Sequence, residues 1–565
     1  MTHSRSASSL GLHASPRLAA LVAAAALGTL FSAIAGPAAL SQTLTPGNLL
    51  VSRSRYVNDH PVKIGDILPP GCTGTTGGCA SGSGAVTDSS YPYVFGNDVY
   101  DGSFGITSPI FLDQITTKGK WVSTIEVPNS TQPGITSTSD QLVTSFSSKS
   151  ELALHLSTDG KTISFMGYVA PVNSVDVSNS NTPRGVDLTN PVGENFYRAV
   201  ANVNSKGRFI FTQTNAYSGN NGRSAILNSA LDVFYTAGNA GNGGNPQPAA
   251  IVAGAGAQFI PQIPRSEYTQ NTGLPKPLGS FSVTELGDKA DKIGKDDNFR
   301  GMALYNDVVY FTKGSGGNGV NTVYFIDTTG TACPSTGVGL PVPGAALPTA
   351  SIPYVLATVA TTGLTSNMCI LQGFPVALAK KANPVAYPFG LWFANSTTLY
   401  VADEGDGYAG GSDLYTHAAT QTTAGLQKWA FNSTTQSWTY AYTLQTGLDL
   451  GLPYSLSAYP TGINPVTGLD WTPATDGLRN ITGMVGDGTE VPVGKVILYG
   501  VTSTVSGNGD QGADPNKLEY IVDDIANTDP TVAAKEYFHT LRAALSAEVL
   551  RGVSFTPSTA NITSF

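Results

Sequence analysis

Four arginines recur in the same short sequence context. They stand in the phrases G-R-S-A-I-L, F-R-G-M-A-L, L-R-N-I-T-G and L-R-G-V-S-F, and they are Arg223, Arg300, Arg479 and Arg551. A guanidinium group presents a planar fork of donors that suits carboxylate and phosphate groups. If the phrases are equivalent elements of a repeated fold, the four side chains lie at one level around one axis. They would then line a channel mouth that binds an anion.

A structural role competes with this anion site. Each arginine can instead bond carbonyls or acids of the neighbouring repeat, and recurrence in successive repeats favours that role because a binding site is usually asymmetric. Converging cations repel one another, so each needs a partner. The candidate acids on the same face are Asp296, Asp297, Asp403, Glu404 and Glu548.

An acidic, glycine-rich segment, A-D-E-G-D-G-Y, offers a second kind of site. Asp403, Glu404 and Asp406 are hard oxygen donors on a flexible loop, which is the ligand type that calcium prefers. The spacing is not that of an EF-hand loop, and a solvated turn is the simpler interpretation. Calcium is therefore the one cofactor that the sequence suggests.

Signatures of catalysis are sparse, so the catalytic residues stay unknown. There is no G-x-S-x-G elbow, no P-loop and no dinucleotide fingerprint. The histidines after residue 35 are not in metal-ligand spacing. His417 lies in the long loop after Asp413 and is the one histidine expected near the channel face, where simple exposure is its more ordinary role.

The phrases imply the elements that position these residues. Two further copies are P-F-G-L-W-F from Pro388 and a weaker S-E-L-A-L-H from Ser150, which makes six. Most are followed by a polar turn and a second β-rich run. Repeats of this length made of short strands are typical of a β-propeller, in which the first strand of each blade lines the channel. The loops expected on the arginine face are residues 238–244, 314–319, 403–413 and 506–514.

We therefore predict an all-β chain, a single β-propeller of six four-stranded blades. Residues 225–227, 233–237, 251–253 and 281–284 are one predicted blade, and residues 299–305, 308–312, 322–326 and 354–359 are another. The last phrase is too close to the end to build a blade alone. It is predicted to pair residues 552–556 with residues 48–52, so that strands from both ends close the ring. A seventh blade within residues 60–105 or 255–295 is the alternative.

Composition and the N-terminal segment agree with an exported β protein. Residues 1–35 carry basic residues, an apolar stretch and a small-x-small motif, which predict a signal peptide; residues 36–46 are an extension and residues 47–565 the propeller. Only 12% of residues are charged and the net charge is −9, which argues against nucleic acid and anionic membrane surfaces as partners. No later run is long enough to span a bilayer. The predicted location is secreted, periplasmic or on the cell surface.

Four cysteines in an exported chain predict two disulfides. Local pairing joins Cys72 to Cys79 and Cys333 to Cys369, because each pair closes a Gly/Pro-rich segment. A metal site is the competing interpretation, and no CxxC spacing or neighbouring histidine supports it.

Five stretches together resemble a widespread family of exported bacterial β-propeller proteins. They are residues 109–128, 156–168, 216–225, 299–316 and 399–405 with 425–429. The resemblance implies the fold and export, but no activity, so it transfers no functional residue. This chain departs from the family in longer inserts near residues 60–90 and 328–385.

Two functions remain open from the sequence. The first is a non-catalytic binding or structural platform that presents the channel face to a glycan, a small anion or a cell-surface protein. The alternative is a calcium-dependent hydrolase of lactonase, esterase or phytase type, with acids at the channel mouth activating water. The absence of catalytic signatures favours the first.

Overall fold

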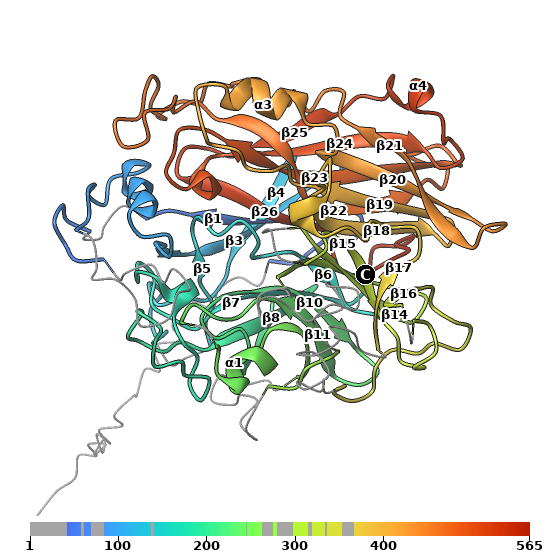
Figure 1. The fold of residues 1–565 in the computed structure, drawn as a ribbon, viewed down its shortest axis with the longest axis horizontal. Coiled ribbons are helices and arrows are strands. Elements are labelled where there is room, and N and C mark those ends of the chain that lie inside the picture. The colour runs from blue at the N-terminus through green and yellow to red at the C-terminus, as the bar shows by residue number, and fades with distance from the viewer. Residues whose placement is uncertain are drawn as a thin grey trace, which may run out of the picture. The chain divides into compact units, whose positions relative to one another are not determined.

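Six small sheets surround a common axis and form the blades of a β-propeller (Figure 1). The sheets are antiparallel apart from one parallel pair, β16 with β17. A computed structural model describes residues 42–57, 62–68, 84–136, 140–244, 246–262, 275–279, 298–314, 319–333, 336–352 and 367–565. The predicted all-β, six-bladed propeller is confirmed.

The blades follow one another along the chain, except that the first contains the last strand. Blade 1 is β26 (Glu548–Phe555), β1 (Leu49–Arg55), β3 (Ile110–Ile115) and β4 (Trp121–Glu126). Blade 2 is β6 (His155–Leu156), β7 (Thr162–Tyr168), β8 (Arg198–Asn204) and β9 (Phe209–Thr214). Blade 3 is β10 (Gly222–Asn228), β11 (Val233–Gly238) and β12 (Gly256–Pro261).

The remaining blades are built in the same way. Blade 4 is β13 (Phe299–Tyr305), β14 (Val308–Lys313), β15 (Thr322–Ile326), β17 (Met368–Leu371) and β16 (Val338–Gly339). Blade 5 is β18 (Pro388–Asn395), β19 (Thr398–Asp403), β20 (Gly425–Asn432) and β21 (Ser437–Leu444). Blade 6 is β22 (Ala474–Val485), β23 (Lys495–Val505), β24 (Lys517–Asp524) and β25 (His539–Ala543).

Short elements lie between the blade strands. The helices are α1 (Ala249–Ala253), α3 (Leu414–Thr420) and α4 (Pro530–Ala533). The 3-10 helices among the described residues are η1 (Tyr93–Val99), with seven residues, and the single turns η2 (Val177–Asn179), η4 (Ala379–Lys381) and η5 (Gln511–Ala513). A two-stranded sheet pairs β2 (Thr107–Ser108) with β5 (Thr144–Ser145).

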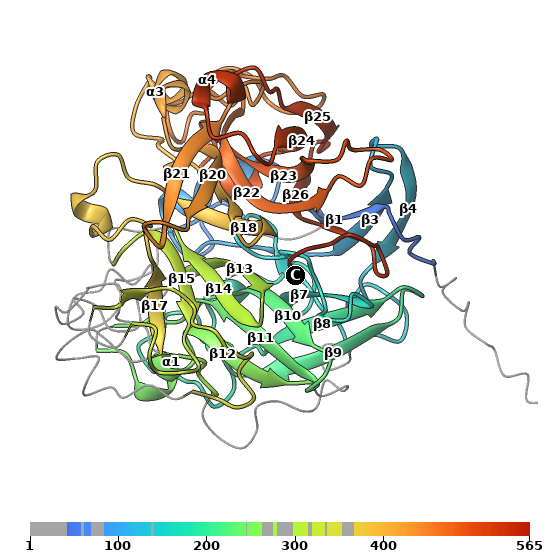
Figure 2. The same ribbon diagram turned by 90° about the vertical axis from the view of Figure 1, so that its right-hand side faces the viewer.

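The two ends of the propeller chain meet in blade 1, as predicted. Strand β26 pairs antiparallel with β1, and the register matches Leu49 with Phe555 and Val51 with Val553. Figures 1 and 2 show this strand from the end of the chain beside the blue strands from its beginning. Closing the ring in this way removes two sheet edges that would otherwise be exposed.

Burial falls from the inner to the outer strand of a blade, which explains the sequence pattern. Every residue of β10 and of β26 is buried, whereas β4 and β25 are largely exposed. An inner strand packs on neighbouring blades through both faces, so its polar residues are buried along with its apolar ones.

Most predicted strands of the blades are confirmed, with one error. Residues 251–253 were predicted as a strand of blade 3, but they lie in helix α1, and β12 begins at Gly256. The run Ile-Val-Ala is short and apolar, and periodicity cannot separate a buried helical turn from a strand at that length. The predicted strands 281–284 and 354–359 lie outside the described residues, and β17 pairs with β15 in blade 4.

One of the two predicted disulfides is present. Cys333 and Cys369 are bonded, with their Cα atoms 5.8 Å apart, and they join the loop after β15 to strand β17. Cys72 and Cys79 lie outside the described residues. Among the described residues, no helix combines the length and apolar character needed to cross a membrane.

Candidate functional site

The repeated arginines stand on β-bulges of the inner strands. At the arginine position, each of the inner strands β10, β13, β22 and β26 has one more residue than the strand paired with it. Strand β18 has the same bulge, with Phe389 in place of an arginine. A bulge turns one side chain out of the regular alternation of a strand. The repeated phrase therefore encodes a change of side-chain direction as well as a strand.

The residue after each bulged position contacts the next blade. Ser224 donates to the Arg300 carbonyl at 3.1 Å, and Asn480 donates to the Arg551 carbonyl at 2.7 Å. In the other three copies this residue is glycine. A Cβ atom at Gly301, Gly390 or Gly552 would lie 2.1, 2.7 or 2.2 Å from the carbonyl oxygen of Phe389, Arg479 or Leu152. The equivalent contacts hold the bulges, and hence the arginines, at one level around the axis.

Glu404 lies between two of the arginines at the channel mouth, Arg300 and Arg479. Its Oε2 accepts from Arg479 Nε at 3.0 Å, and its Oε1 lies 3.8 Å from Arg300 Nη2. All three side chains are nearly buried, with 6–12% of their surface exposed. A buried ion pair of this kind depends on both partners, because either charge alone would be poorly solvated.

The other two arginines bond neutral groups. Arg223 donates to the side-chain oxygens of Asn221 and Asn298 and to the Phe299 carbonyl. Arg551 donates to the Phe146 and Gly512 carbonyls. Among the described residues, Arg551 Nε and Nη1 and Arg300 Nε are buried and have no hydrogen-bond partner.

Burial lowers the pKa of three of these arginines, because the charged guanidinium is poorly solvated inside the protein. Burial lowers the pKa of Arg551 to about 9, and the positive charge of Arg479 adds to the shift. Burial also lowers the pKa of Arg223, helped by the charge of Arg300. The pKa of Arg300 is lowered by burial as well, while Glu404 opposes the shift. These charges are held in place without full compensation by the acids nearby.

The expected partners are only partly correct. Glu404 is confirmed, but Glu548 pairs with Arg53 at 2.6 Å rather than with Arg551. The carboxylate of Asp403 accepts from the backbone N–H groups of Tyr387 and Gly405. Asp296 and Asp297 lie outside the described residues.

The predicted calcium ligands are not brought together. Asp403 faces the backbone inside blade 5, and burial raises its pKa to about 6. Glu404 faces the two arginines, and Asp406 Oδ2 lies 2.6 Å from His417 Nε2. Within the part of the chain that the structure describes, no three acidic, histidine or cysteine side chains are arranged to hold a metal ion.

His417 lies beside the channel mouth, as expected, but on helix α3 rather than in a loop. Its ring stacks on Tyr408, with ring centroids 4.1 Å apart, and its side chain is about one third exposed. The contact with Asp406 fixes the orientation of the imidazole. The pair stands at the edge of the pocket, since Asp406 but not His417 is among the lining residues.

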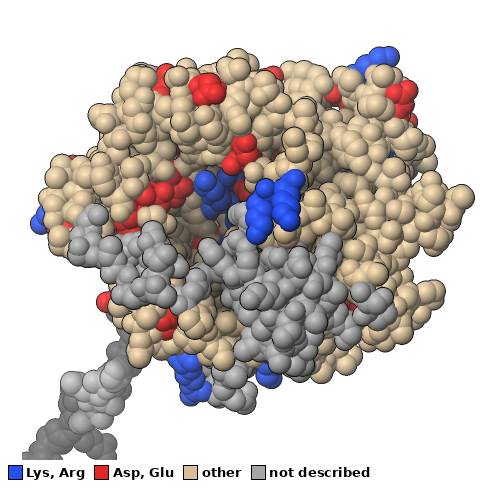
Figure 3. Space-filling model, in the orientation of Figure 1, with Lys and Arg blue, Asp and Glu red and all other residues tan. Residues whose placement is uncertain are grey.

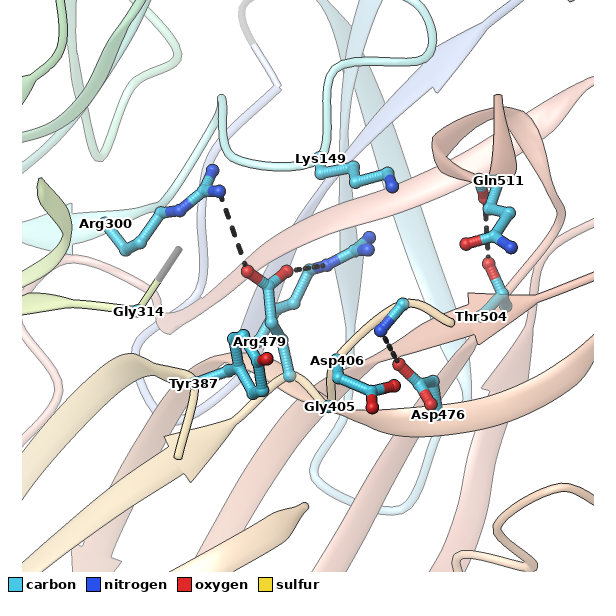
Figure 4. A pocket seen from close by; sticks show the side chains of 12 residues that line it. Lys149, Arg300, Gly314, Tyr387, Gly405, Asp406, Asp476, Arg479, Thr504 and Gln511 are labelled. Carbon is cyan, nitrogen blue, oxygen red and sulfur yellow. Dashed lines mark hydrogen bonds and ion pairs between the residues drawn. The ribbon is translucent and has the colours of Figure 1, made fainter. Parts of the chain in front are cut away.

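A pocket of about 150 Å³ occupies this end of the channel. Its lining combines basic, acidic and neutral side chains: Lys149, Arg300, Tyr387, Glu404, Asp406, Asp476, Arg479, Thr504 and Gln511 (Figure 4). Three of the predicted face loops contribute to the lining, through Gly314, residues 404–407 and Gln511. Figure 3 shows a hollow near the centre of one face, with basic and acidic side chains around it.

Sequence reasoning missed three lining residues that stand just ahead of a repeated phrase. Lys149 precedes the phrase that starts at Ser150, Tyr387 precedes Pro388, and Asp476 comes two residues before Leu478. Burial raises the pKa of Asp476 to about 7, and the charges of Asp406 and Glu404 raise it further. The position relative to the phrase was a signal that could have identified them.

The last residues of the chain lie at the other end of the channel. Phe565 pairs with Leu304 of β13 through two backbone hydrogen bonds of 2.7 and 3.1 Å, and Phe393 N donates to Ser564 Oγ at 3.2 Å. Ile562, Ser564 and Phe565 line a cavity of only about 20 Å³ with inner-strand residues of blades 1, 2, 5 and 6. The label C near the middle of Figures 1 and 2 marks this position. The channel is therefore narrow below the arginines.

Comparison with known proteins adds no function. No protein-family model matches the chain, and no curated protein is significantly similar to it.

Proposed function

We propose that this chain is an exported, non-catalytic β-propeller that binds a small anion at the arginine-lined end of its channel. The observation that carries the proposal is the pair of arginines that line the pocket, Arg300 and Arg479, which share the one carboxylate of Glu404 while Nε of Arg300 has no partner among the described residues. Arg223 and Arg551 stand at the equivalent positions of their strands but do not line this pocket. A buried donor left unpaired costs about 1–3 kcal/mol, and more when it is charged. An anion supplies both the missing acceptors and the missing negative charge.

The charge balance supports the same ligand class. Among the described residues, Glu404 is the carboxylate within 4.0 Å of these arginines, and it contacts only Arg300 and Arg479. Arg223 and Arg551 bond neutral oxygens and have lowered pKa values. A bound carboxylate or oxyanion would raise these pKa values toward the ordinary one, because the added negative charge favours the protonated guanidinium.

Export rests on the predicted signal peptide, the family resemblance and the Cys333–Cys369 disulfide.

Among the partners suggested by the sequence, the size of the pocket favours a small anion over a glycan chain or a protein surface. The calcium-dependent hydrolase is the weaker proposal, because Asp403, Glu404 and Asp406 face three different partners.

The test is thermal unfolding of the purified chain with phosphate, sulfate or glucuronate, against sodium chloride at equal ionic strength. A ligand at a hundred times its Kd stabilises by about 2.7 kcal/mol. For roughly 520 residues at about 2.1 cal/mol/K each, this raises Tm by about 2–3 °C.

Two matched variants locate the effect. Arg300→Gln should lose the response, whereas Arg208→Gln, which changes an exposed arginine, should keep it. An unchanged Tm with every anion, or an equal response in both variants, would exclude a site at the arginines.

A further inference from the structure

The pocket has two sides of opposite charge. In Figure 4 the basic ends of Lys149, Arg300 and Arg479 lie on one side and the carboxylates of Asp406 and Asp476 on the other. A simple anion would satisfy the basic side and be repelled by the acidic one. The lining therefore selects a ligand that carries both charges.

The basic side still has free bonding capacity for a carboxylate. Arg479 uses Nε to bond Glu404, and Arg300 contacts Glu404 through Nη2 while its buried Nε has no partner. Arginine can bond a carboxylate through two nitrogens at once. Thr504 and Gln511 line the same space and add neutral polar groups.

The acidic side has the composition of an ammonium site. Asp476 is buried and held by the Gly407 N–H at 2.8 Å and by Gln421 Nε2 at 2.5 Å. Tyr387 lines the pocket on this side, and after burial the charges of Asp406, Asp403 and Asp476 raise its pKa. A cation is stabilised both by carboxylates and by the face of an aromatic ring. A ligand ammonium would also relieve the repulsion between Asp476 and its acidic neighbours.

The dimensions limit the ligand to a small molecule. A group the size of a water molecule needs about 15 Å³ of cavity. The pocket of about 150 Å³ therefore has room for on the order of ten such groups. Below the arginines the channel narrows to the cavity of about 20 Å³ that is lined by the last residues of the chain. A long chain cannot pass through, and the ligand must enter and leave at the arginine face.

We propose that the pocket binds a small zwitterion of the amino-acid type. Its carboxylate lies against Arg300, Arg479 and Lys149, and its ammonium against Asp476 and Asp406. This inference rests on the proposed function and specifies the ligand class of the same site.

The experiment compares four probes by calorimetry with the full chain: β-alanine, propionate, propylamine and inorganic phosphate. β-Alanine should bind at least about tenfold tighter than propionate, since one hydrogen bond to a charged group contributes about 1.5–3 kcal/mol. Asp476→Asn keeps the shape but removes the charge, so it should abolish this preference by weakening the binding of β-alanine and strengthening that of propionate, which the acidic side no longer repels as strongly. Glu519→Gln is the control, because Glu519 is a buried acid of the same blade that does not line the pocket.

Each outcome separates this inference from the proposed function. If propionate and phosphate bind but β-alanine binds no better, or if Asp476→Asn leaves the preference intact, the zwitterion is wrong and the anion site stands. If none of the probes binds, both proposals fail. Should Asp476→Asn fail to fold, Asp406→Asn provides the same test, because the Asp406 side chain is one quarter exposed and tolerates change better.

Discussion

The two arginines Arg479 and Arg551 should respond in different ways to the same substitution. Arg479→Met removes the closest partner of Glu404 and leaves that buried carboxylate with Arg300 at 3.8 Å. Breaking a buried ion pair from one side costs about 3–5 kcal/mol. With about 1.1 kcal/mol/K for roughly 520 residues, Tm should fall by about 3–5 °C.

Arg551→Met removes a buried positive charge that destabilises the folded state, because burial takes the guanidinium out of water. A pKa near 9 instead of 12.5 corresponds to about 5 kcal/mol at 1.36 kcal/mol per pKa unit. Against this gain stands the loss of hydrogen bonds to the Phe146 and Gly512 carbonyls, about 1–3 kcal/mol each. The two effects nearly cancel, so Tm should change by less than about 2 °C.

The assay is differential scanning calorimetry of both variants, with and without phosphate. We expect Arg479→Met, which changes a lining residue, to lose the stabilisation by phosphate and much stability without it, whereas Arg551→Met, which changes a residue outside the lining, should keep the phosphate response. If Arg551→Met costs as much stability as Arg479→Met in the absence of phosphate, Arg551 is a structural residue. The reasoning from unpaired donors would then be refuted.

Three further predictions concern pH, the bulge and the end of the chain. Asp476 and Glu519 have pKa values raised by burial to about 7, so the folded state binds more protons than the unfolded one. The free energy of unfolding should therefore increase as pH is lowered from 8 to 6, by up to about 1.4 kcal/mol per group per pH unit, and a flat profile in calorimetry would contradict this. Gly301→Ala places a Cβ 2.1 Å from the neighbouring carbonyl and should cost about 2–4 kcal/mol in chemical denaturation, whereas Gly102→Ala, in open space, should be nearly neutral. Deleting residues 561–565 should lower Tm through the lost contacts with blades 4 and 5 but leave phosphate binding intact, and loss of binding would show that these residues shape the pocket.

The blade architecture was predictable because it depends on local sequence. Strand, polar turn and strand recur along the chain, and the end of the chain lacked partners that only its beginning could supply. The predicted strands 299–305 and 322–326 agree with β13 and β15. The disulfide between Cys333 and Cys369 followed from the short distance along the chain.

The site was less predictable because its partners come from distant parts of the sequence. Glu404 bonds Arg479 from 75 residues away, and Arg551 bonds the Phe146 carbonyl from 405 residues away. Spacing along one strand says nothing about such pairs. Asp406 was an expected calcium ligand on its local spacing, yet it faces His417, which lies on a helix that the sequence did not indicate.

The repeated phrase predicts the backbone conformation of the inner strands better than it predicts the role of the side chain at the bulge. Six phrases recur because each inner strand must pack closely on the next, and in five of them the strand is bulged at the arginine position. The side chains at that position are not equivalent: two arginines share Glu404, two bond neutral oxygens, and Phe389 replaces one altogether. A ring of equal structural arginines would give each the same partner. The partners are therefore asymmetric on a symmetric framework of bulges, and recurrence of the arginine in the sequence does not by itself assign all four a single shared structural role.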